Sequence, residues 1–210
     1  MISHALIIIA NEMQRHLEEA YAVAPVPASV AIGNVGEGIA NSSGIPRDLI
    51  ILTIVNVREE RALKNLPNAI RNDATNKVTY ENQPFHLNLT LLITATHSSY
   101  SSALLMLSRA LRFFQSTNVF TQSTVSPLSI TANAPPNIRD RLAEFRLILD
   151  LQSPTMEEVN HLWGTLGGKQ YPFALFNVRL LDLKFDLPYA EGGVVLSVVQ
   201  DVMQISEGKP

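Results

Sequence analysis

Residues that could carry acid–base or nucleophilic chemistry are few in this 210-residue chain, which has five His and no Cys. The strongest candidate is His97-Ser98-Ser99, which lies where a strand-like pattern changes to a helical one. A catalytic triad needs a Ser activated by a His and a carboxylate, and no Ser in this sequence lies in a nucleophile-elbow pattern. We therefore interpret Ser98 or Ser99 as a helix N-cap, whose hydroxyl can accept from a free N–H group.

A metal or nucleotide site is not indicated either. Glu158 and His161 are three residues apart and can share a helix face, as in carboxylate metal sites, but no second such pair completes a ligand set. The loop over residues 33–38 has neither the spacing of a dinucleotide fingerprint nor a Gly-Lys-Ser/Thr motif. We expect no cofactor and no metal, and we interpret His161 as part of an exposed helix face with a local hydrogen bond.

Two other residues have structural interpretations. His86 alternates with apolar residues in a strand-like segment, so we expect a surface or interface side chain. Trp163 falls on the same helix side as Val159 and Leu166, which predicts a core anchor.

A cluster of mixed charge follows an almost unbroken apolar segment. Such clusters are usually solvated, but between subunits they can also set the register of an assembly. The candidate interface residues of this cluster are Arg58, Glu59, Glu60, Arg61 and Lys64.

Composition argues against several classes of partner. The formal net charge is -3 and the basic residues are scattered, whereas phosphate binding needs clustered Lys and Arg. The apolar start of the chain is cut short by Asn11, Glu12 and Arg15, so it fits neither a signal peptide nor a membrane span. We expect no nucleic-acid partner, no direct membrane insertion, and a chain that is made and folded in the cytosol.

Apolar periodicity predicts three helices. The first covers Ile2–Tyr21. The second covers residues 97–115, is expected to be covered on more than one side, and has a main apolar stripe of Tyr100, Ala103, Leu104, Leu107, Leu111 and Phe114. The third starts at Ser153-Pro154 and ends near Leu166, where Gly167-Gly168 supplies a left-handed stop.

Between the helices, strand-like patterns predict a β-sheet. These patterns lie at Val30–Gly33, Leu49–Val57, Phe85–Thr94, Phe145–Leu151, Tyr171–Phe185 and Val194–Ile205. The run from 49 to 57 favours a central strand covered on both faces, because it is almost unbroken in apolar and β-branched residues. Residues 59–83 show little periodicity and predict a long excursion, and the prolines between 127 and 136 predict a loop-rich connection. The fold class is α/β (α+β), a mixed β-sheet flanked by helices.

Four stretches of the sequence, taken in order, resemble one family. They are Val55–Asn65, Phe85–Ala95, Leu107–Phe120 and Leu162–Pro172. Together they resemble the N-terminal domain of the cap, or tail-terminator, proteins of antifeeding-prophage-type contractile injection systems. The resemblance covers most of residues 1–185, and its most specific part is the Leu-Trp-Gly sequence with the Gly-Gly-Lys-Gln that follows it.

This resemblance implies a phage tail-terminator-like fold and a structural role without enzyme activity. It implies a hexameric ring that caps the end of the inner tube, engages the last ring of the sheath and stops polymerisation. The implied partners are other copies of the chain, the inner tube protein and the sheath protein. The implied location is the end of an injection particle, after synthesis in the bacterial cytoplasm. Another tail or baseplate-adaptor subunit, or an α/β hydrolase-type enzyme, remains the alternative.

We predict a cap domain over residues 1–185 and a β-rich C-terminal extension or arm over 186–210. Gly192-Gly193 is expected to free the segment after it, which is β-prone and carries little charge. This segment either pairs with a neighbouring chain by strand addition or completes the sheet of its own subunit. Its residues are Val194, Val195, Leu196, Ser197, Val198 and Val199.

Overall fold

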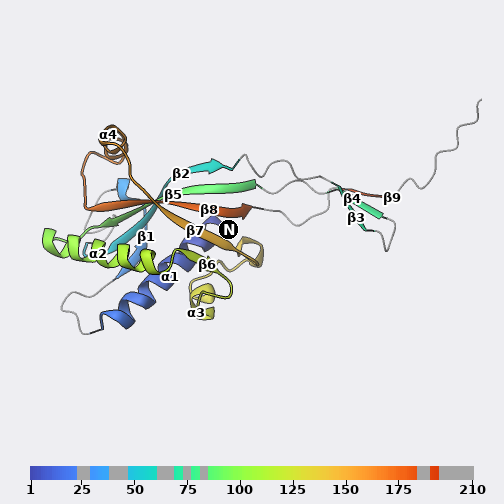
Figure 1. Cartoon of the computed structure of the whole chain (residues 1–210), viewed down its shortest axis with the longest axis horizontal. Helices are drawn as coiled ribbons and strands as arrows, with labels where there is room; N and C mark the ends of the chain where they lie inside the picture. Colours follow the sequence, from blue (N-terminus) through green and yellow to red (C-terminus); the bar gives the residue numbers. More distant parts are fainter. Residues whose placement is uncertain are drawn as a thin grey trace, which may run out of the picture.

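Two β-sheets form the frame of the part of the protein that the structure, a computed structural model, describes (Figure 1). The described residues are 1–22, 29–37, 47–60, 69–72, 77–80, 85–183 and 190–193. The larger sheet has the strand order β1-β2-β5-β8-β7-β6, with bounds Val30–Ile32, Ile50–Glu59, Phe85–Ala95, Phe173–Leu183, Arg146–Gln152 and Val119–Thr121. The smaller sheet lies apart from it in the order β3-β4-β9, with bounds Ala69–Asn72, Lys77–Tyr80 and Ala190–Gly193 (Figure 1).

The larger sheet is mixed, as expected from the sequence. Strand β1 pairs with β2 in parallel, and the other neighbours pair antiparallel. The helices on this sheet are α1 (Ile2–Ala20), α2 (Tyr100–Ser116) and α4 (Met156–Thr165), while α3 (Pro127–Thr131) follows β6. The predicted fold class, a mixed β-sheet flanked by helices, is confirmed.

Strand β2 corrects one detail of the prediction. Its first half, Ile50–Thr53, is buried, but the second half from Asn56 to Glu59 is exposed. The register shifts between Ile54 and Asn56, which is the signature of a β-bulge, and the strand lies next to the short edge strand β1. The apolar run therefore predicts a strand correctly, but it does not predict that the second half of the strand is exposed, because burial depends on which elements pack against the strand in space.

The face under α1 and α2 holds the larger core. Helix α1 contributes Ile8, Ile9, Met13 and Leu17, all nearly inaccessible to solvent, because its apolar residues recur at helical spacing. The sheet contributes alternate residues of its strands, which point to one side because side chains alternate along a strand. These residues are Ile50, Leu52, Leu89, Leu91, Ile93, Phe120, Leu147, Leu149, Ala174, Phe176 and Val178.

Helix α2 buries the predicted stripe only in part: Ala103 and Phe114 are buried, and Leu107 and Leu111 pack against the core. Tyr100 and Leu104, two residues of the predicted stripe, are exposed, and the buried residues are Ala103, Met106, Arg109, Ala110, Phe113 and Phe114. The Phe113 ring makes edge-to-face contacts with Phe114 and Phe120, with ring centroids 4.9 Å and 6.0 Å apart. The prediction was wrong for Tyr100 and Leu104, because leucines lie on both sides of this helix and the pattern alone does not show which side packs on the sheet.

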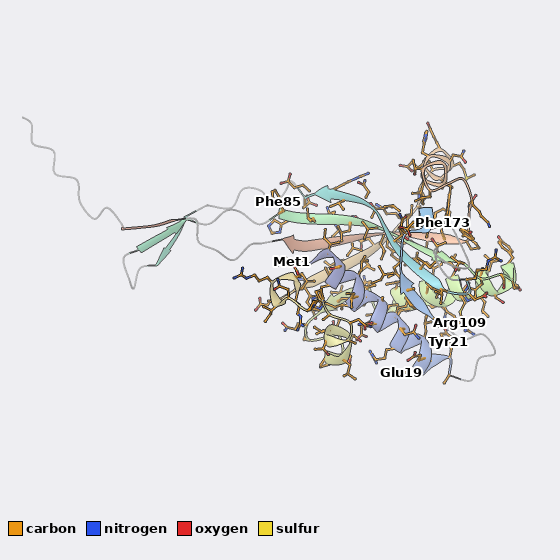
Figure 2. All side chains as sticks on the ribbon, turned by 180° about the vertical axis from the view of Figure 1, so that it is seen from behind. Met1, Glu19, Tyr21, Phe85, Arg109 and Phe173 are labelled. Atoms are coloured by element: carbon orange, nitrogen blue, oxygen red, sulfur yellow. The ribbon has the colours of Figure 1, made fainter. Side chains whose placement is uncertain are left out.

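Arg109 on α2 is a buried cation that lies against the C-terminal end of α1 (Figure 2). Its guanidinium lies 4.2 Å from the centre of the Tyr21 ring, and no carboxylate among the described residues pairs with it. Tyr21 is the C-cap of α1, where the helix dipole is negative. The aromatic face and the helix end together provide the electrostatic partner that a carboxylate would otherwise supply.

The opposite face of the sheet carries α4 and a smaller core. The members of this core are Val35, Ile51, Leu92, Val159, Trp163 and Leu175, which confirms Trp163 as a core anchor. Helix α4 begins with a capping box in which Thr155 and Glu158 satisfy each other's backbone N–H groups, so the cap is Thr155 and not Ser153. Gly167 and Gly168 have φ of 94° and 75°, which confirms the predicted left-handed stop.

The smaller sheet replaces part of the predicted excursion. Within residues 59–83, β3 and β4 pair antiparallel, with Ala69 opposite Tyr80. Strand β9 then adds to β4, with Gly192 opposite Val78 and Gly193 opposite Lys77. Both glycines thus belong to a paired strand, while the segment after them, which they are expected to free, lies outside the described residues. The domain boundary at residue 185 stays a prediction.

Polar side chains of α1 hold the connection after β6. His4 Nε2 lies 2.9 Å from the Ile130 carbonyl oxygen, and His4 Nδ1 accepts from the Leu142 N–H at 2.8 Å. Glu12 accepts from the Ser126 N–H at 2.6 Å and from Arg15 Nη2 at 2.7 Å. The loop-rich connection predicted around the prolines is thus ordered, and it contains α3 and the short 3-10 helix η3 (Ile138–Asp140).

Candidate assembly surface

The predicted charge cluster lies where β2 emerges from the core. Arg58 and Glu59 end the strand, and Glu60 follows it. The Glu60 N–H donates to the His86 carbonyl at 2.7 Å, and the Glu60 carboxylate accepts from Asn88 Nδ2 at 2.9 Å. Arg61 and Lys64 lie outside the described residues. Of this cluster, the structure therefore places three residues, all next to strand β5.

A groove runs beside this end of β2, between α4 and the sheet. Its volume is about 600 Å³. Apolar and polar groups both line it, and the lining residues are Val55, Asn56, Arg58, Thr90, Gln152, Ser153, Pro154, Glu158, His161, Leu162 and Leu175. Arg58 is thus shared by the charge cluster and the groove, which the sequence could not show because α4 follows β2 by about a hundred residues.

The two charged side chains in the groove differ in their partners: Glu158 is hydrogen-bonded within α4, whereas Arg58 is not in a short ion pair with the described residues. Hydrogen bonds from the Thr155 N–H and hydroxyl hold the pKa of Glu158 below its ordinary value, with a smaller contribution from Arg58. Glu158 therefore stays ionised while it caps α4. Arg58 is exposed and forms no ion pair shorter than 4.0 Å with the described residues. The groove consequently offers one guanidinium to a negatively charged partner.

The sheet face next to the groove is polar and open. Arg179 on β8 and Asp150 on β7 form an ion pair of 2.6 Å, and both are about half exposed. Asp150 lies opposite Asn177 and Arg179 opposite Ile148, so the ion pair is a diagonal neighbour across two strands. Helix α4 covers only one part of this face, and the remainder is available to a partner.

The His97 segment does not form a triad. Asp48 Oδ1 accepts from the Ser98 N–H at 2.9 Å and from the Ser98 hydroxyl at 3.1 Å, and these bonds lower the pKa of Asp48. Burial lowers the pKa of His97, which Asp48 opposes, and neither ring nitrogen of His97 has a described hydrogen-bond partner. A working triad would join the carboxylate to the imidazole and the imidazole to the Ser.

The start of α2 is organised by Asp48 and not by a serine. Ser99 is the N-cap residue, as one of the two predicted, but its side chain makes no capping hydrogen bond. Asp48, which has a φ of 64°, reaches across from the start of β2 instead. Sequence reasoning missed Asp48, because its partner lies 50 residues away and no local signal marks it.

The other His residues singled out in the sequence have ordinary surroundings. His161 is largely exposed on α4 and lies 3.7 Å from Glu157, while the predicted neighbour Glu158 is occupied by the capping box. His86 is half-buried on β5. Within the described residues, no group of three or more His, Asp or Glu side chains could hold a metal ion.

Comparison with known families identifies the fold. Residues 7–197 match the family described as the Pvc16 N-terminal domain. The chain belongs to this family. The match spans both described sheets, from α1 through β9, so the smaller sheet is part of the Pvc16 N-terminal domain as the family defines it.

Two solved structures have the same fold. One is the sheath/tube terminator, in the extended state, of the extracellular contractile injection system PVC, with a TM-score of 0.54 and 11% identity over 95% of this chain. The other is the anti-feeding prophage cap, described as a tube terminating cap, with a TM-score of 0.51 and 15% identity over 92% of this chain. The present chain spans 64% and 60% of the length of these two proteins. No curated protein matches the sequence.

Two further observations bear on this Pvc16 N-terminal domain. Among the described helices, none combines the length and the apolar character that a membrane crossing requires. The candidate partner strand Val194–Val199 lies outside the described residues and stays a prediction.

Proposed function

We propose that this protein is a structural cap subunit, or tail terminator, of a phage-tail-like contractile injection system. Copies of the chain form a hexameric ring that ends the inner tube and the sheath and stops their polymerisation. Membership in the Pvc16 N-terminal domain family carries this proposal. The fold shared with a sheath/tube terminator and a tube terminating cap supports it.

The proposed role requires surfaces and no reaction. A ring subunit needs a rigid body, a contact with each neighbour and a contact with the tube or sheath. The closed core under α1 and α2 is suited to the rigid body. The groove beside α4 and the open polar face are suited to contacts, and Arg58 gives them an anchor for a carboxylate. The protein works at the end of a particle that assembles in the bacterial cytoplasm, without nucleic acid, cofactor or membrane insertion.

Electron microscopy of particles made with and without this chain tests the proposal. We expect tubes and sheaths of unregulated length when the chain is absent, and density for the chain at the tube end when it is present. Unchanged lengths and ends would overturn the proposal. Density at the baseplate would instead support the alternative of a baseplate-adaptor subunit.

The charge cluster can be tested by reversing Arg58. We propose that Arg58, Glu59 and Glu60, together with Arg61 and Lys64, set the register against a neighbouring subunit or the sheath. Arg58→Glu should remove the chain from particles while its melting temperature stays unchanged, because Arg58 is exposed. Arg47→Glu, on an exposed arginine that precedes the opposite end of β2, is the matched control. Equal loss with both variants would show a general charge effect and contradict this role for Arg58.

A further inference from the structure

One side of helix α1 is hydrogen-bonded to the connection over residues 126–142, which contains α3 and η3 and no β-strand. Figure 1 shows α3 beside α1. Three side chains of the helix, His4, Asn11 and Glu12, bind main-chain groups of this connection. The main-chain groups belong to Ser126, Ser129, Ile130, Ala132 and Leu142. Side chains of α1, rather than strand pairing, therefore fix the backbone of the connection.

The partners of His4 determine where its ring carries a proton. The side chain is only 1% exposed. Nδ1 accepts from the Leu142 N–H at 2.8 Å, so Nδ1 carries no proton. Nε2 lies 2.9 Å from the carbonyl oxygen of Ile130, which can only accept, so Nε2 carries the proton. Together the two partners require the neutral imidazole.

A protonated imidazole cannot make both of these hydrogen bonds. It is a donor at both nitrogens, so the Leu142 N–H would face a second N–H group. The amide of Leu142 would then be a buried donor without an acceptor, which is costly. The ring can therefore accept a second proton only if the backbone at Leu142 moves away.

The charged groups around His4 also disfavour a positive ring. Helix α3 has no charged residue. Along α1, the next charged group after the Met1 ammonium is Glu12, which is already paired with Arg15. The rest of the connection and the residues just after it contribute Arg139, Asp140, Arg141 and Glu144, and the Met1 ammonium donates to the Asp140 carbonyl. Cations thus outnumber carboxylates around the Leu142 end of the connection, so a further positive charge is repelled.

We propose that His4 and Glu12 form a latch on the connection, and that the His4 part of this latch opens in mild acid. Between about pH 7.5 and 5.5 His4 gains a proton, and the Leu142 end of the connection is released. Glu12 still holds the Ser126 end. Burial raises the pKa of Glu12, but hydrogen bonds from Arg15 and Ser126 outweigh burial and lower the pKa overall, so the carboxylate stays ionised in this range. The connection therefore opens from one end only.

Amide hydrogen exchange of the whole chain, followed residue by residue, tests the latch. Protection of the Leu142 amide, corrected for the intrinsic pH dependence of exchange, should fall about tenfold between pH 7.5 and 5.5, as expected for the loss of one hydrogen bond. Protection of the Ser126 amide should not change, because its acceptor is Glu12. Unchanged protection at Leu142, or an equal fall at both amides, would overturn the proposal.

A substitution separates His4 from the other histidines. The fall in melting temperature from pH 7.5 to 5.5 should be smaller in His4→Gln, which has no titrating ring at this position. Part of the fall should remain, because burial also lowers the pKa of His97. His161→Gln is the matched control, since its side chain is 79% exposed, and it should keep the full fall. Equal falls in the two variants would contradict the latch.

The nitrogen chemical shifts of the His4 ring give a second readout in the unaltered chain, which decides the matter if His4→Gln does not fold. At pH 7.5 they should show a proton on Nε2 alone, and at pH 5.5 a proton on both nitrogens. A ring that stays neutral at pH 5.5, or becomes charged while Leu142 stays protected, would refute the latch. None of these measurements needs a particle, so the latch and the cap role can fail separately.

Discussion

The two faces of the six-stranded sheet differ in how completely they are covered. The face under α1 and α2 is packed with apolar side chains from most of the strands. The other face has a small core around Trp163, beside which lie the groove and the Asp150–Arg179 ion pair. The comparison teaches that the two faces serve different purposes. The face under α1 and α2 excludes water and stabilises the fold, while the other face keeps polar groups hydrated until a partner covers them.

Polar groups also differ between the two faces. Burial raises the pKa of Glu12 on the closed side, but the hydrogen bonds from Arg15 and Ser126 outweigh burial and lower the pKa overall. Glu158 on the open side has a lowered pKa as well, but its carboxylate is exposed. A buried carboxylate that loses a partner is costly, whereas an exposed one is rehydrated. The same type of substitution should therefore have unequal effects on the two faces.

The largest expected effect comes from the closed face. Phe113→Ala removes a buried ring that contacts Phe114 and Phe120, and we expect the free energy of unfolding to fall by about 3–5 kcal/mol. Tyr100→Ala on the exposed side of the same helix should change it by less than about 0.5 kcal/mol. Urea denaturation measures both. Similar losses from the two variants would mean that α2 is packed on both sides in the isolated subunit.

A smaller effect is expected from Glu12→Ala, which leaves the partly buried Ser126 N–H without its Glu12 acceptor. We expect a loss of about 1–3 kcal/mol at neutral pH. Because the folded-state pKa of Glu12 is lowered, this contribution is complete above the unfolded pKa of about 4.3 and is lost as the pH falls through the folded pKa. The difference between wild type and variant should therefore shrink in acid.

Glu19→Ala is the matched control for Glu12→Ala. Glu19 also pairs with Arg15, at 2.9 Å, but it is largely exposed (Figure 2). Its removal should cost no more than about 0.5 kcal/mol, as for other exposed helix pairs. If the Glu19 variant lost as much stability as the Glu12 variant, the ion pair with Arg15 would matter more than burial.

The sequence predicted the elements whose signals are local. Periodicity predicts α1, β5, β7 and β8 because the residues that cover each element repeat at its own spacing. The stop after α4 was predictable because Gly167 and Gly168 adopt a left-handed backbone that favours glycine. The buried face of α2 was predictable only in part, because leucines on both sides make the pattern ambiguous: Ala103 and Phe114 are buried as predicted, but Tyr100 and Leu104 are exposed.

The missed features depend on partners that are distant in the chain. Strands β3, β4 and β9 have four residues each, and β9 joins β4 only after more than a hundred intervening residues. The position of Arg58 beside α4 is equally non-local, so the candidate site was recognised as a charge cluster but not as one side of a groove. The cap of α4 was a local signal that was overlooked: Thr155 and Glu158 have the spacing of a capping box.

On the open face, the capping box gives a test of moderate size. Thr155→Ala removes the hydroxyl that accepts from the Glu158 N–H, and we expect a loss of about 1 kcal/mol. Ser153→Ala is the matched control, because Ser153 is exposed two residues earlier and caps no helix. Thermal denaturation with both variants should show a lower melting temperature for Thr155→Ala alone. A loss for Ser153→Ala would instead place the start of α4 where the sequence first suggested it.

The smallest effect is expected at the ion pair on the open face. Asp150 and Arg179 are 2.6 Å apart, yet both are about half exposed, so water competes with the pair and the two side chains lose conformational freedom when they meet. A double-mutant cycle with Asp150→Ala and Arg179→Ala should give a coupling energy of about 0.2–1 kcal/mol, and high salt should reduce it by screening.

The same cycle measured on assembled particles tests whether a partner covers this face. If a partner covers this face, the pair loses water, and removing one charge alone should weaken assembly more than removing both. A coupling energy that is already large in the isolated subunit, and insensitive to salt, would show that this half of the sheet is closed without a partner and that the contrast between the two faces is wrong.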